Sequence, residues 1–588
     1  MRRGKGDQRE GLASAAGNDP RDGETEEGTI AGGSGIVRSR SPPFRFACTR
    51  LSTVTLPAPD PTIPSDGSDL VAARREKLRK HREELGIEPY GERIDGLHSL
   101  ADARALFAEA DSLAFEASEA ARRADPTAPL HDRRAVARVA GRVVQHRDIG
   151  KLVFVRLRDA SGDLQVTISK ANVGEERDFA LAKQLDYGDI VVAEGPIGRT
   201  KTGEICVWAK RLSMHAKSIA PPPEKWHGLT DPEIRYRKRY VDMYANPEVI
   251  QTFAARSRIV SRMRRYMESQ GYLEVETPMM QPLAGGAAAR PFMTHHNALD
   301  MPLFMRIAPE LYLKRLLVGG MPKVFEINRN FRNEGVDRSH NPEFTAMEAY
   351  QAFGDYMTML DLVEGLVFDL ARQQWLDRRA AGHAVEGSED APILPFGALA
   401  IDYRRPFERV RYAELFERAC GFPMDDIAKV RAQARAMHLK DEAKLDDWLV
   451  INEVFEEAAE PLLDPQRPTF VLDYPSAISP LTRPKRSNPT LCDRWDLFIA
   501  GMEIGPAYSE LNDPDIQRAK FTEQLRGADD EESTFRSLDH DFLEALEVGM
   551  PPAGGMGLGV DRLVMLLTDS QSIRDVILFP LLKRAEGS

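Results

Sequence analysis

The sequence predicts an α+β protein in which a small β-barrel precedes a larger domain built on an antiparallel sheet flanked by helices. Residues 133 to about 217 form short β-branched runs separated by turn residues. The segment 247–270 repeats apolar residues at helical spacing. The segment 325–350 alternates apolar and polar residues on both sides of a turn, which predicts a hairpin. In a chain of 588 residues, these patterns predict at least two domains.

The composition excludes some classes of protein. The formal net charge of −12 argues against a uniformly basic protein that neutralises DNA phosphates without regard to sequence. RNA binding would need local basic patches. No uncharged apolar run approaches the roughly 18 residues of a membrane helix, so we expect no membrane association. The cysteines fit no zinc or redox motif, so we expect reduced thiols in a cytoplasmic protein: Cys48, Cys206, Cys420 and Cys492.

The N-terminal segment 1–67 is rich in Gly, Ser, Pro and Arg, and has too little apolar surface to offset the entropy of ordering. We expect it to be disordered. Residues 30–55 carry Arg and Ser without acids, as a transit peptide does, but Asp and Glu are frequent just before them. This charge pattern favours a cytoplasmic location over import into an organelle.

A helical segment, 68–132, follows. Ser68 is a suitable helix cap, Val71, Leu78 and Leu85 recur on one stripe, and Gly86 predicts the end of the first helix. The opposite face of this helix is strongly basic. It is either a solvated surface or a contact for an RNA backbone, and the sequence favours neither.

Residues 133–220 contain five β-branched runs and predict an OB-fold barrel. The runs are AVARVAGRVV, LVFVRLRD, LQVTIS, DIVVAEGPI and EICVWAKRL. Prolines 221–223 then form a stiff hinge to the larger domain, 221–588. That domain begins with the predicted helix 247–270, whose apolar stripe is Phe253, Ile259, Met263 and Met267. Residues 376–396 are polar and lack a pattern, which predicts a loop insertion.

The predicted hairpin carries charge at its mouth. It reads FEINRNFRNEG from Phe325 to Gly335, followed by HNPEFTAMEAY ending at Tyr350. This string resembles motif 2 of the class II aminoacyl-tRNA synthetases, and its HNPEFT continuation is similar to the lysine-specific members. GYLEVETPMM, residues 271–280, resembles motif 1, and GGMGLGVDRLVMLL, residues 554–567, resembles motif 3. An ordinary strand or turn would explain either string alone, but the order of all three favours the synthetase fold.

The resemblance covers residues from about 70 to 588 apart from the segment 376–396, and implies a reaction. A member of this family joins lysine to ATP as lysyl-adenylate and then transfers it to tRNA(Lys). The match implies that Arg332 spans the lysine carboxylate and the α-phosphate, while Arg562 neutralises the tail of a bent ATP. Phe344 stacks on adenine. The other nucleotide-binding positions are Glu334, His340, Asn341 and Gly559.

The same resemblance implies that about three Mg²⁺ ions accompany ATP, held by Asp496 and Glu503. Asp496 is a departure, because the family usually has Glu at both positions. For the amino acid, Glu348, Tyr350 and Glu510 match the positions that hold the side-chain ammonium. Glu310 and the backbone of Gly286 match the positions that hold the α-ammonium.

A second departure is Pro506, where bacterial lysine enzymes carry an asparagine that contacts the substrate carboxylate. Proline has no side-chain donor and no N–H, so this contact is in doubt. In the barrel, Phe154, Gln165 and Glu204 match the positions that read the anticodon, although Phe154 in the barrel core is the alternative. The resemblance also implies a homodimer.

Three other functions remain open. One is a sister synthetase for aspartate or asparagine, which would have little use for Glu348 and Glu510. Another is a paralogue that transfers lysine to a protein, but such relatives lack the anticodon barrel. The last is a non-catalytic RNA-binding regulator. Loss of catalysis would first remove charged site residues that are costly to bury, yet Arg332, Glu503 and Arg562 are all present.

Overall fold

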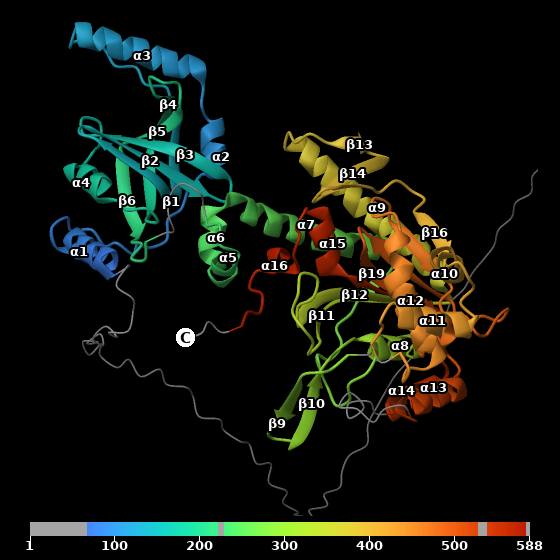
Figure 1. The fold of residues 1–588 in the computed structure, drawn as a ribbon. Coiled ribbons are helices and arrows are strands. Elements are labelled where there is room, and N and C mark those ends of the chain that lie inside the picture. Colours follow the sequence, from blue (N-terminus) through green and yellow to red (C-terminus); the bar gives the residue numbers. More distant parts are fainter. Residues whose placement is uncertain (1–67, 222–228, 288, 441, 527–537, 584–588) are drawn as a thin grey trace, which may run out of the picture. The chain divides into compact units, whose positions relative to one another are not determined.

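The computed structural model describes residues 68–221, 229–287, 289–440, 442–526 and 538–583 (Figure 1). The segment 1–67, Cys48 and the last two hinge prolines lie outside these ranges. The predicted α+β class is confirmed: the chain forms an OB-fold barrel and a second domain in which helices flank a mixed sheet. None of the helices in the described part of the chain is long and apolar enough to cross a membrane.

The basic helix α1 (Ser68–Glu83) has fewer free charges than its sequence suggests. The buried Arg74 donates to the carbonyl oxygen of Ser218 at 3.0 Å. Lys77 pairs with Asp186 at 2.6 Å. Arg79 pairs with Glu76 at 2.6 Å, and Arg82 with Glu88 at 2.9 Å. These pairs leave a weaker attraction for phosphates than the bare sequence indicates.

The barrel closes because β1 pairs with both β2 and β4 (Figure 1). Its strands are β1 (Val136–Ile149), β2 (Leu152–Asp159), β3 (Gly162–Ser169), β4 (Ile190–Arg199), β5 (Ile205–Ala209) and β6 (Arg211–Ala216). The fifth predicted run is interrupted at Lys210, and both β5 and β6 pair with β4. Val153, Val155 and Leu157 alternate into the barrel core, as the period of a strand requires.

Among the described residues, eight strands form the sheet of the larger domain. Their order is β16 (Glu408–Arg411), β17 (Thr469–Leu472), β18 (Arg494–Ile499), β19 (Met502–Ser509), β20 (Ala553–Gly559), β12 (Glu343–Ala352), β11 (Lys323–Phe331) and β7 (Leu273–Glu274). The predicted motif 2 hairpin is confirmed as β11 and β12. Pairing is antiparallel from β17 to β11 and parallel where β16 and β7 join at the edges.

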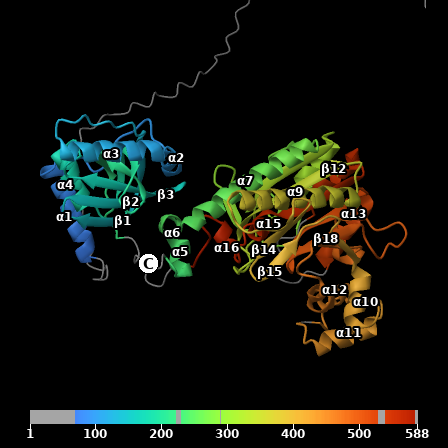
Figure 2. The same ribbon diagram turned by 90° about the horizontal axis from the view of Figure 1, so that it is seen from above.

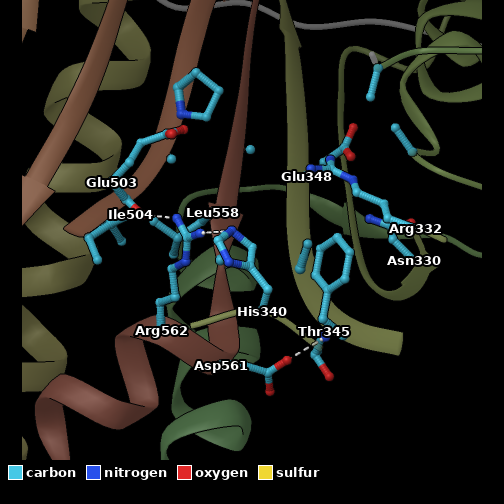
Figure 3. A pocket seen from close by; sticks show the side chains of 18 of the residues that line it. Asn330, Arg332, His340, Thr345, Glu348, Glu503, Ile504, Leu558, Asp561 and Arg562 are labelled. Carbon is cyan, nitrogen blue, oxygen red and sulfur yellow. Dashed lines mark hydrogen bonds between the residues drawn. The ribbon is translucent and has the colours of Figure 1, made fainter. Parts of the chain in front are cut away.

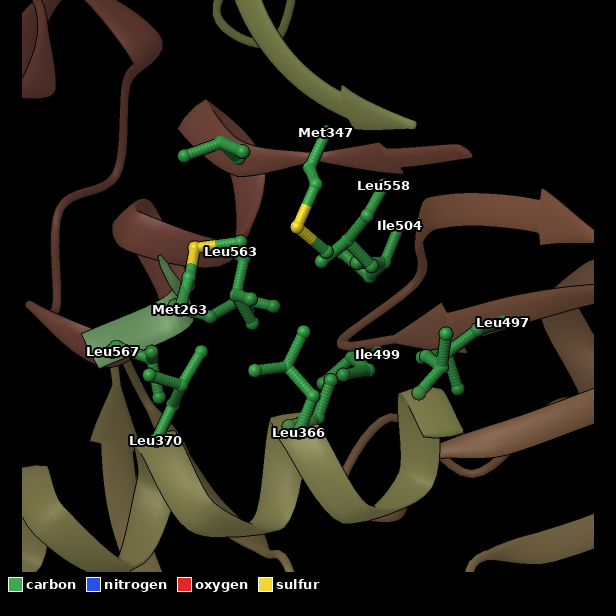
Figure 4. Packing of buried hydrophobic residues seen from close by; sticks show 14 of the residues in the cluster. Met263, Met347, Leu366, Leu370, Leu497, Ile499, Ile504, Leu558, Leu563 and Leu567 are labelled. Carbon is green, nitrogen blue, oxygen red and sulfur yellow. The ribbon is translucent and has the colours of Figure 1, made fainter. Parts of the chain in front are cut away.

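The main core lies on one face of this sheet, under α7 (Pro247–Ser269), α9 (Tyr356–Ala380) and α15 (Val560–Leu567). Helices α7 and α9 run side by side in Figure 2. The predicted apolar stripe of α7 is buried, so the helix prediction is confirmed. In Figure 4, Leu366 and Leu370 of α9 face Met347, Ile504 and Leu558 of the sheet.

The opposite face of the hairpin packs against α8 (Glu310–Val318) and α14 (His540–Gly549). Since side chains alternate along a strand, Met347 and Ala349 enter the main core while Tyr350 faces α8. Glu348 shares the face of Tyr350 and is also buried. The alternation therefore places polar residues of β12 beside α8.

The loop prediction for 376–396 was wrong. Helix α9 continues to Ala380, and a hairpin of β13 (Glu386–Ser388) and β14 (Ala391–Phe396) follows. The indole of Trp375 donates to the carbonyl oxygen of Glu386 at 2.7 Å, and Leu394 is only 1% exposed in the main core. Tertiary contacts therefore order this segment, in which a polar stretch precedes the apolar APILPF of β14.

Candidate active site

A cavity of about 450 Å³ opens on the α8 face of the sheet (Figure 3). It is lined by β11, β12, β19, β20, the start of α15 and the loop before α8. Of the fourteen residues predicted for lysine and ATP, twelve line this cavity. They are Gly286, Glu310, Arg332, Glu334, His340, Asn341, Phe344, Glu348, Tyr350, Glu503, Gly559 and Arg562. Asp496 and Glu510 lie behind its wall.

Arg332 follows β11 directly, and its backbone N–H donates to the carbonyl oxygen of Pro342 at 2.9 Å, which holds the mouth of the hairpin. The guanidinium carbon lies 5.1 Å from the ring centroid of Phe344. Its Nε is buried without a hydrogen-bond partner in the described structure. An unpaired buried donor is costly, so this arginine is ready to bind an anion. Phe344 lines the cavity and is only half-buried, which excludes a plain core role.

Arg562 is held from two sides. One Nη donates to the carbonyl oxygen of Glu503 at 2.6 Å, and the other donates to Nε2 of His340 at 3.0 Å. His340 in turn donates from Nδ1 to Asp337 at 2.7 Å. These hydrogen bonds, drawn in part in Figure 3, connect α15 to the loop between β11 and β12.

Asp561, which sequence reasoning missed, anchors the start of α15. Its carboxylate accepts the backbone N–H of Thr345 at 2.6 Å and pairs with Arg256 of α7 at 2.5 Å. The segments that resemble motifs 2 and 3 are therefore joined to α7, the helix that precedes motif 1. The sequence signal for this role was the position of Asp561 directly before Arg562.

The acidic part of the cavity contains Glu310 and Glu348, which are 6% and 9% exposed. The hydroxyl of Tyr350 donates to Oε2 of Glu348 at 3.1 Å. Burial raises the pKa of Glu348 to about 8, and the charge of Glu310 adds to this shift. A carboxyl group in this state gains a full charge when a cation arrives.

Glu510, predicted to bind the side-chain ammonium of lysine, lies directly behind the cavity wall, next to Gly555. It is fully buried, outside the cavity lining, and its Oε2 lies 2.5 Å from Nζ of Lys314. The same Nζ lies 2.6 Å from Oε1 of Glu310. Lys314 was missed by the sequence analysis, although its place four residues after Glu310 on one helix was a usable signal.

Glycine is required at two places around these acids. A Cβ on Gly555 of β20 would lie 2.0 Å from Oε1 of Glu510, so only glycine allows this approach. Gly286 has a φ of +86°, and a Cβ there would meet that of Glu310 at 3.3 Å. Pro506, the second departure from the family pattern, also lines the cavity.

The two carboxylates predicted to hold metal differ in their surroundings. Asp496 accepts two hydrogen bonds from Arg494, at 2.9 and 2.6 Å. Glu503 lines the cavity, and the pKa of its carboxyl group is raised by burial and by the charge of Asp496. Within the described ranges, no group of three or more His, Cys, Asp and Glu side chains is arranged to hold a metal.

The predicted anticodon residues share the outer face of the barrel. Phe154 is half-buried between the core residues Val153 and Val155, so it points outward and the core alternative is excluded. Gln165 pairs in register with Arg156, whose guanidinium lies 3.6 Å from Glu204. Arg147, missed in the sequence, lies 5.2 Å from the Phe154 ring.

Comparison with known proteins agrees with this geometry. The family model described as "tRNA synthetases class II (D, K and N)" matches residues 231–583, and the OB-fold nucleic acid binding domain matches residues 137–222. A lysine–tRNA ligase of Carboxydothermus hydrogenoformans is 45% identical over 519 residues, which are 88% of this chain and 98% of that protein. The ligase of Moorella thermoacetica is 46% identical over 88% of this chain and 99% of its own. One from Anaeromyxobacter sp. is 50% identical over 76% of this chain and 87% of its own. The chain belongs to the class II tRNA synthetases of the aspartate, lysine and asparagine group.

Proposed function

We propose that this protein is a lysine–tRNA ligase, which activates L-lysine with ATP to lysyl-adenylate and pyrophosphate, and then transfers lysine to the 3′ end of tRNA(Lys). The observation that carries the proposal is one cavity containing an unpaired arginine, Arg332, and two buried acids, Glu310 and Glu348. Lysine has one carboxylate, which Arg332 can bind, and two ammonium groups, which Glu310 and Glu348 can bind.

In adenylate formation, the lysine carboxylate attacks the α-phosphate of ATP and pyrophosphate leaves. Two anions must meet, so the barrier is lowered by cations fixed in advance. Arg332 has a free Nε for this purpose. Arg562, fixed by His340 and the Glu503 carbonyl, neutralises the outer phosphates. No side-chain nucleophile is needed.

The nucleotide lies on the Phe344 side of the cavity, with adenine stacked on that ring. Glu334, His340, Asn341 and Gly559 surround it. Mg²⁺ prefers oxygen ligands and keeps several waters, and about three ions fit the family pattern. Glu503 fits as a direct ligand, because its carboxylate reaches the cavity. Asp496 is held by Arg494 and is one methylene shorter than the usual Glu, so it would hold the ion through a bridging water. The ions supply positive charge at the phosphates.

Selection of lysine follows from the acids. Glu348, Tyr350 and Glu510 receive the side-chain ammonium, and Glu310 with the backbone of Gly286 receives the α-ammonium. An aspartate side chain would instead meet buried carboxylates and be repelled. Since Pro506 offers no donor, either Arg332 and water suffice to hold the substrate carboxylate or its affinity is weaker than with the asparagine.

The barrel supplies tRNA recognition. Phe154 presents an outward aromatic face for a splayed anticodon base, and Gln165 and Glu204 offer polar edges beside it. Arg147 and Arg156 add positive charge near these positions. A homodimer is expected at the motif 1 segment, where Leu273 and Met280 are 55% and 56% exposed. We expect the enzyme in the cytoplasm.

The test is amino-acid-dependent exchange of pyrophosphate into ATP, run without tRNA. Lysine should support exchange, whereas aspartate and asparagine should not. Exchange with either of those would favour the sister synthetases. A folded protein that is inactive with all three amino acids would favour the non-catalytic regulator.

A further inference from the structure

A hydrogen bond joins β12 to the start of α15 at the nucleotide site (Figure 3). Strand β12 pairs with β20 as far as Ala346 and Gly559, so the backbone N–H of Thr345 lies beyond the last pair. The carboxylate of Asp561 accepts this N–H at 2.6 Å, in place of the carbonyl group that a longer strand would supply. Asp561 is only 2% exposed. A buried carboxylate keeps such a bond strong only while it is charged and oriented, so it needs a cation beside it.

Arg256 of α7 supplies that cation. Its guanidinium pairs with Asp561 at 2.5 Å and donates to the hydroxyl group of Thr345 at 3.1 Å. The three residues therefore form a closed ring, in which the arginine contacts both partners of the backbone hydrogen bond. Asp561 and Thr345 line the nucleotide cavity, whereas Arg256 lines a second cavity, of about 700 Å³. The arginine thus reaches the ring from outside the nucleotide cavity.

The ring connects the two residues that we assign to opposite ends of ATP. Phe344, which stacks on adenine, directly precedes Thr345 in the sequence. Arg562, which neutralises the outer phosphates, directly follows Asp561. The bond between Thr345 and Asp561 therefore fixes the distance between the aromatic platform and the cation. ATP must meet both at once, so an error in their spacing weakens ATP more than it weakens either part of the molecule.

We propose that Arg256 is a positioning residue for ATP, which maintains the spacing of Phe344 and Arg562 by fixing the carboxylate of Asp561. This inference rests on the proposed function, from which it takes the two ends of the nucleotide site. Arg256 touches no part of ATP and acts only through the ring.

Arg256→Met tests the proposal through the affinity for three ligands. ATP meets both ends of the site, adenosine meets only Phe344, and tripolyphosphate meets only Arg562. In the variant, the Kd of ATP in the presence of Mg²⁺ should rise by about tenfold, as for the loss of a charge-assisted hydrogen bond. The Kd of adenosine and that of tripolyphosphate should each change by less than about twofold. Isothermal titration calorimetry measures all three without catalysis.

The matched control is Arg262→Met on the same helix. Arg262 forms two hydrogen bonds with Asp369 of α9, at 2.6 and 2.7 Å. Its loss should lower stability and leave the affinity for all three ligands unchanged. Arg256→Lys should recover part of the ATP affinity, because an ammonium keeps the charge beside Asp561 but lacks the fork that also reaches Thr345. Should Arg256→Met not fold, Arg256→Lys supports the same comparison with a smaller change.

If adenosine or tripolyphosphate lost as much affinity as ATP in Arg256→Met, the inference would be overturned, because the arginine would then hold the fold or one end of the site alone. An unchanged Kd for ATP would overturn it as well. A wild-type protein that binds ATP but shows no lysine-dependent pyrophosphate exchange would instead refute the proposed function, so the two failures are distinguishable.

Discussion

The guanidinium of Arg562 and the imidazole of His340 lie 3.0 Å apart and join residues more than two hundred positions distant in the chain. Arg562 lies in the first turn of α15, and His340 belongs to the loop between β11 and β12. Because Nε2 of His340 accepts this hydrogen bond, Nδ1 carries the proton that goes to Asp337. The imidazole thus orients the arginine that we assign to the ATP phosphates.

Replacing His340 by Ala should therefore impair ATP use. A hydrogen bond to a charged group contributes about 1.5–3 kcal/mol, so kcat/KM for ATP should fall by about tenfold or more. Steady-state exchange kinetics measure this, and the exposed His383→Ala provides a control. If kcat/KM for ATP were equal in the two variants, His340 would have no role in ATP binding.

Arg332→Lys keeps the charge and removes the planar fork. Lysine cannot span a carboxylate and a phosphate in the same way, so kcat for exchange should fall by about a hundredfold. The matched control is Arg329→Lys on the same hairpin, where the arginine forms only a loose pair with Glu343 at 3.7 Å. A small loss in Arg332→Lys, like that of the control, would contradict the bridging role.

The pH dependence of lysine use should reflect Glu348, which faces Glu310, Glu326, Tyr350 and Arg332. Burial raises its pKa to about 8, so the free enzyme carries it protonated below that pH. Since only the carboxylate pairs with an ammonium, kcat/KM for lysine should fall about tenfold per pH unit below the inflection. The inflection should be absent in Glu348→Gln, and its persistence would assign it to another group.

The same carboxyl group of Glu348 should make the free energy of unfolding depend on pH. Its pKa in the folded state is raised above 4.5, so its contribution is complete below pH 4.5 and is lost as the pH rises through about 8. Without lysine, unfolding free energy should decline over this window less steeply in Glu348→Gln than in the wild type. Denaturant unfolding at several pH values measures the difference.

Phe154→Leu should weaken tRNA binding by the barrel and leave amino acid activation in the larger domain unchanged. Stacking of a base on an aromatic side chain contributes about 1–3 kcal/mol, so the KM for tRNA(Lys) should rise by about tenfold. Exchange without tRNA should stay unchanged, which serves as the internal control. A loss in both assays would indicate damage to the fold.

Features with a local cause could be predicted from the sequence. The hairpin of β11 and β12 follows from alternation around a turn, and α7 follows from Phe253, Ile259, Met263 and Met267 at helical spacing. The residues of motifs 2 and 3 converge on one cavity because β12 and β20 are neighbouring strands. Family resemblance supplied this convergence, since spacing alone does not specify strand order.

Features that depend on tertiary packing were missed. Lys314 and Glu510 are nearly two hundred residues apart, and only the packing of α8 beside the end of β19 brings them to 2.5 Å. The hairpin within 376–396 is ordered by Trp375 and by the burial of Leu394 in the main core, whereas residues 386–390 are polar. Such contacts leave no periodic signal in a single sequence.

The most direct test of the pocket compares lysine with norleucine, which keeps the α-amino acid and the carbon chain but lacks the terminal ammonium. A site built to bind that group rejects the analogue by about 10⁴-fold or more, because its buried acids are left unpaired. The account predicts this ratio of kcat/KM in pyrophosphate exchange. Comparable values for the two amino acids would contradict it.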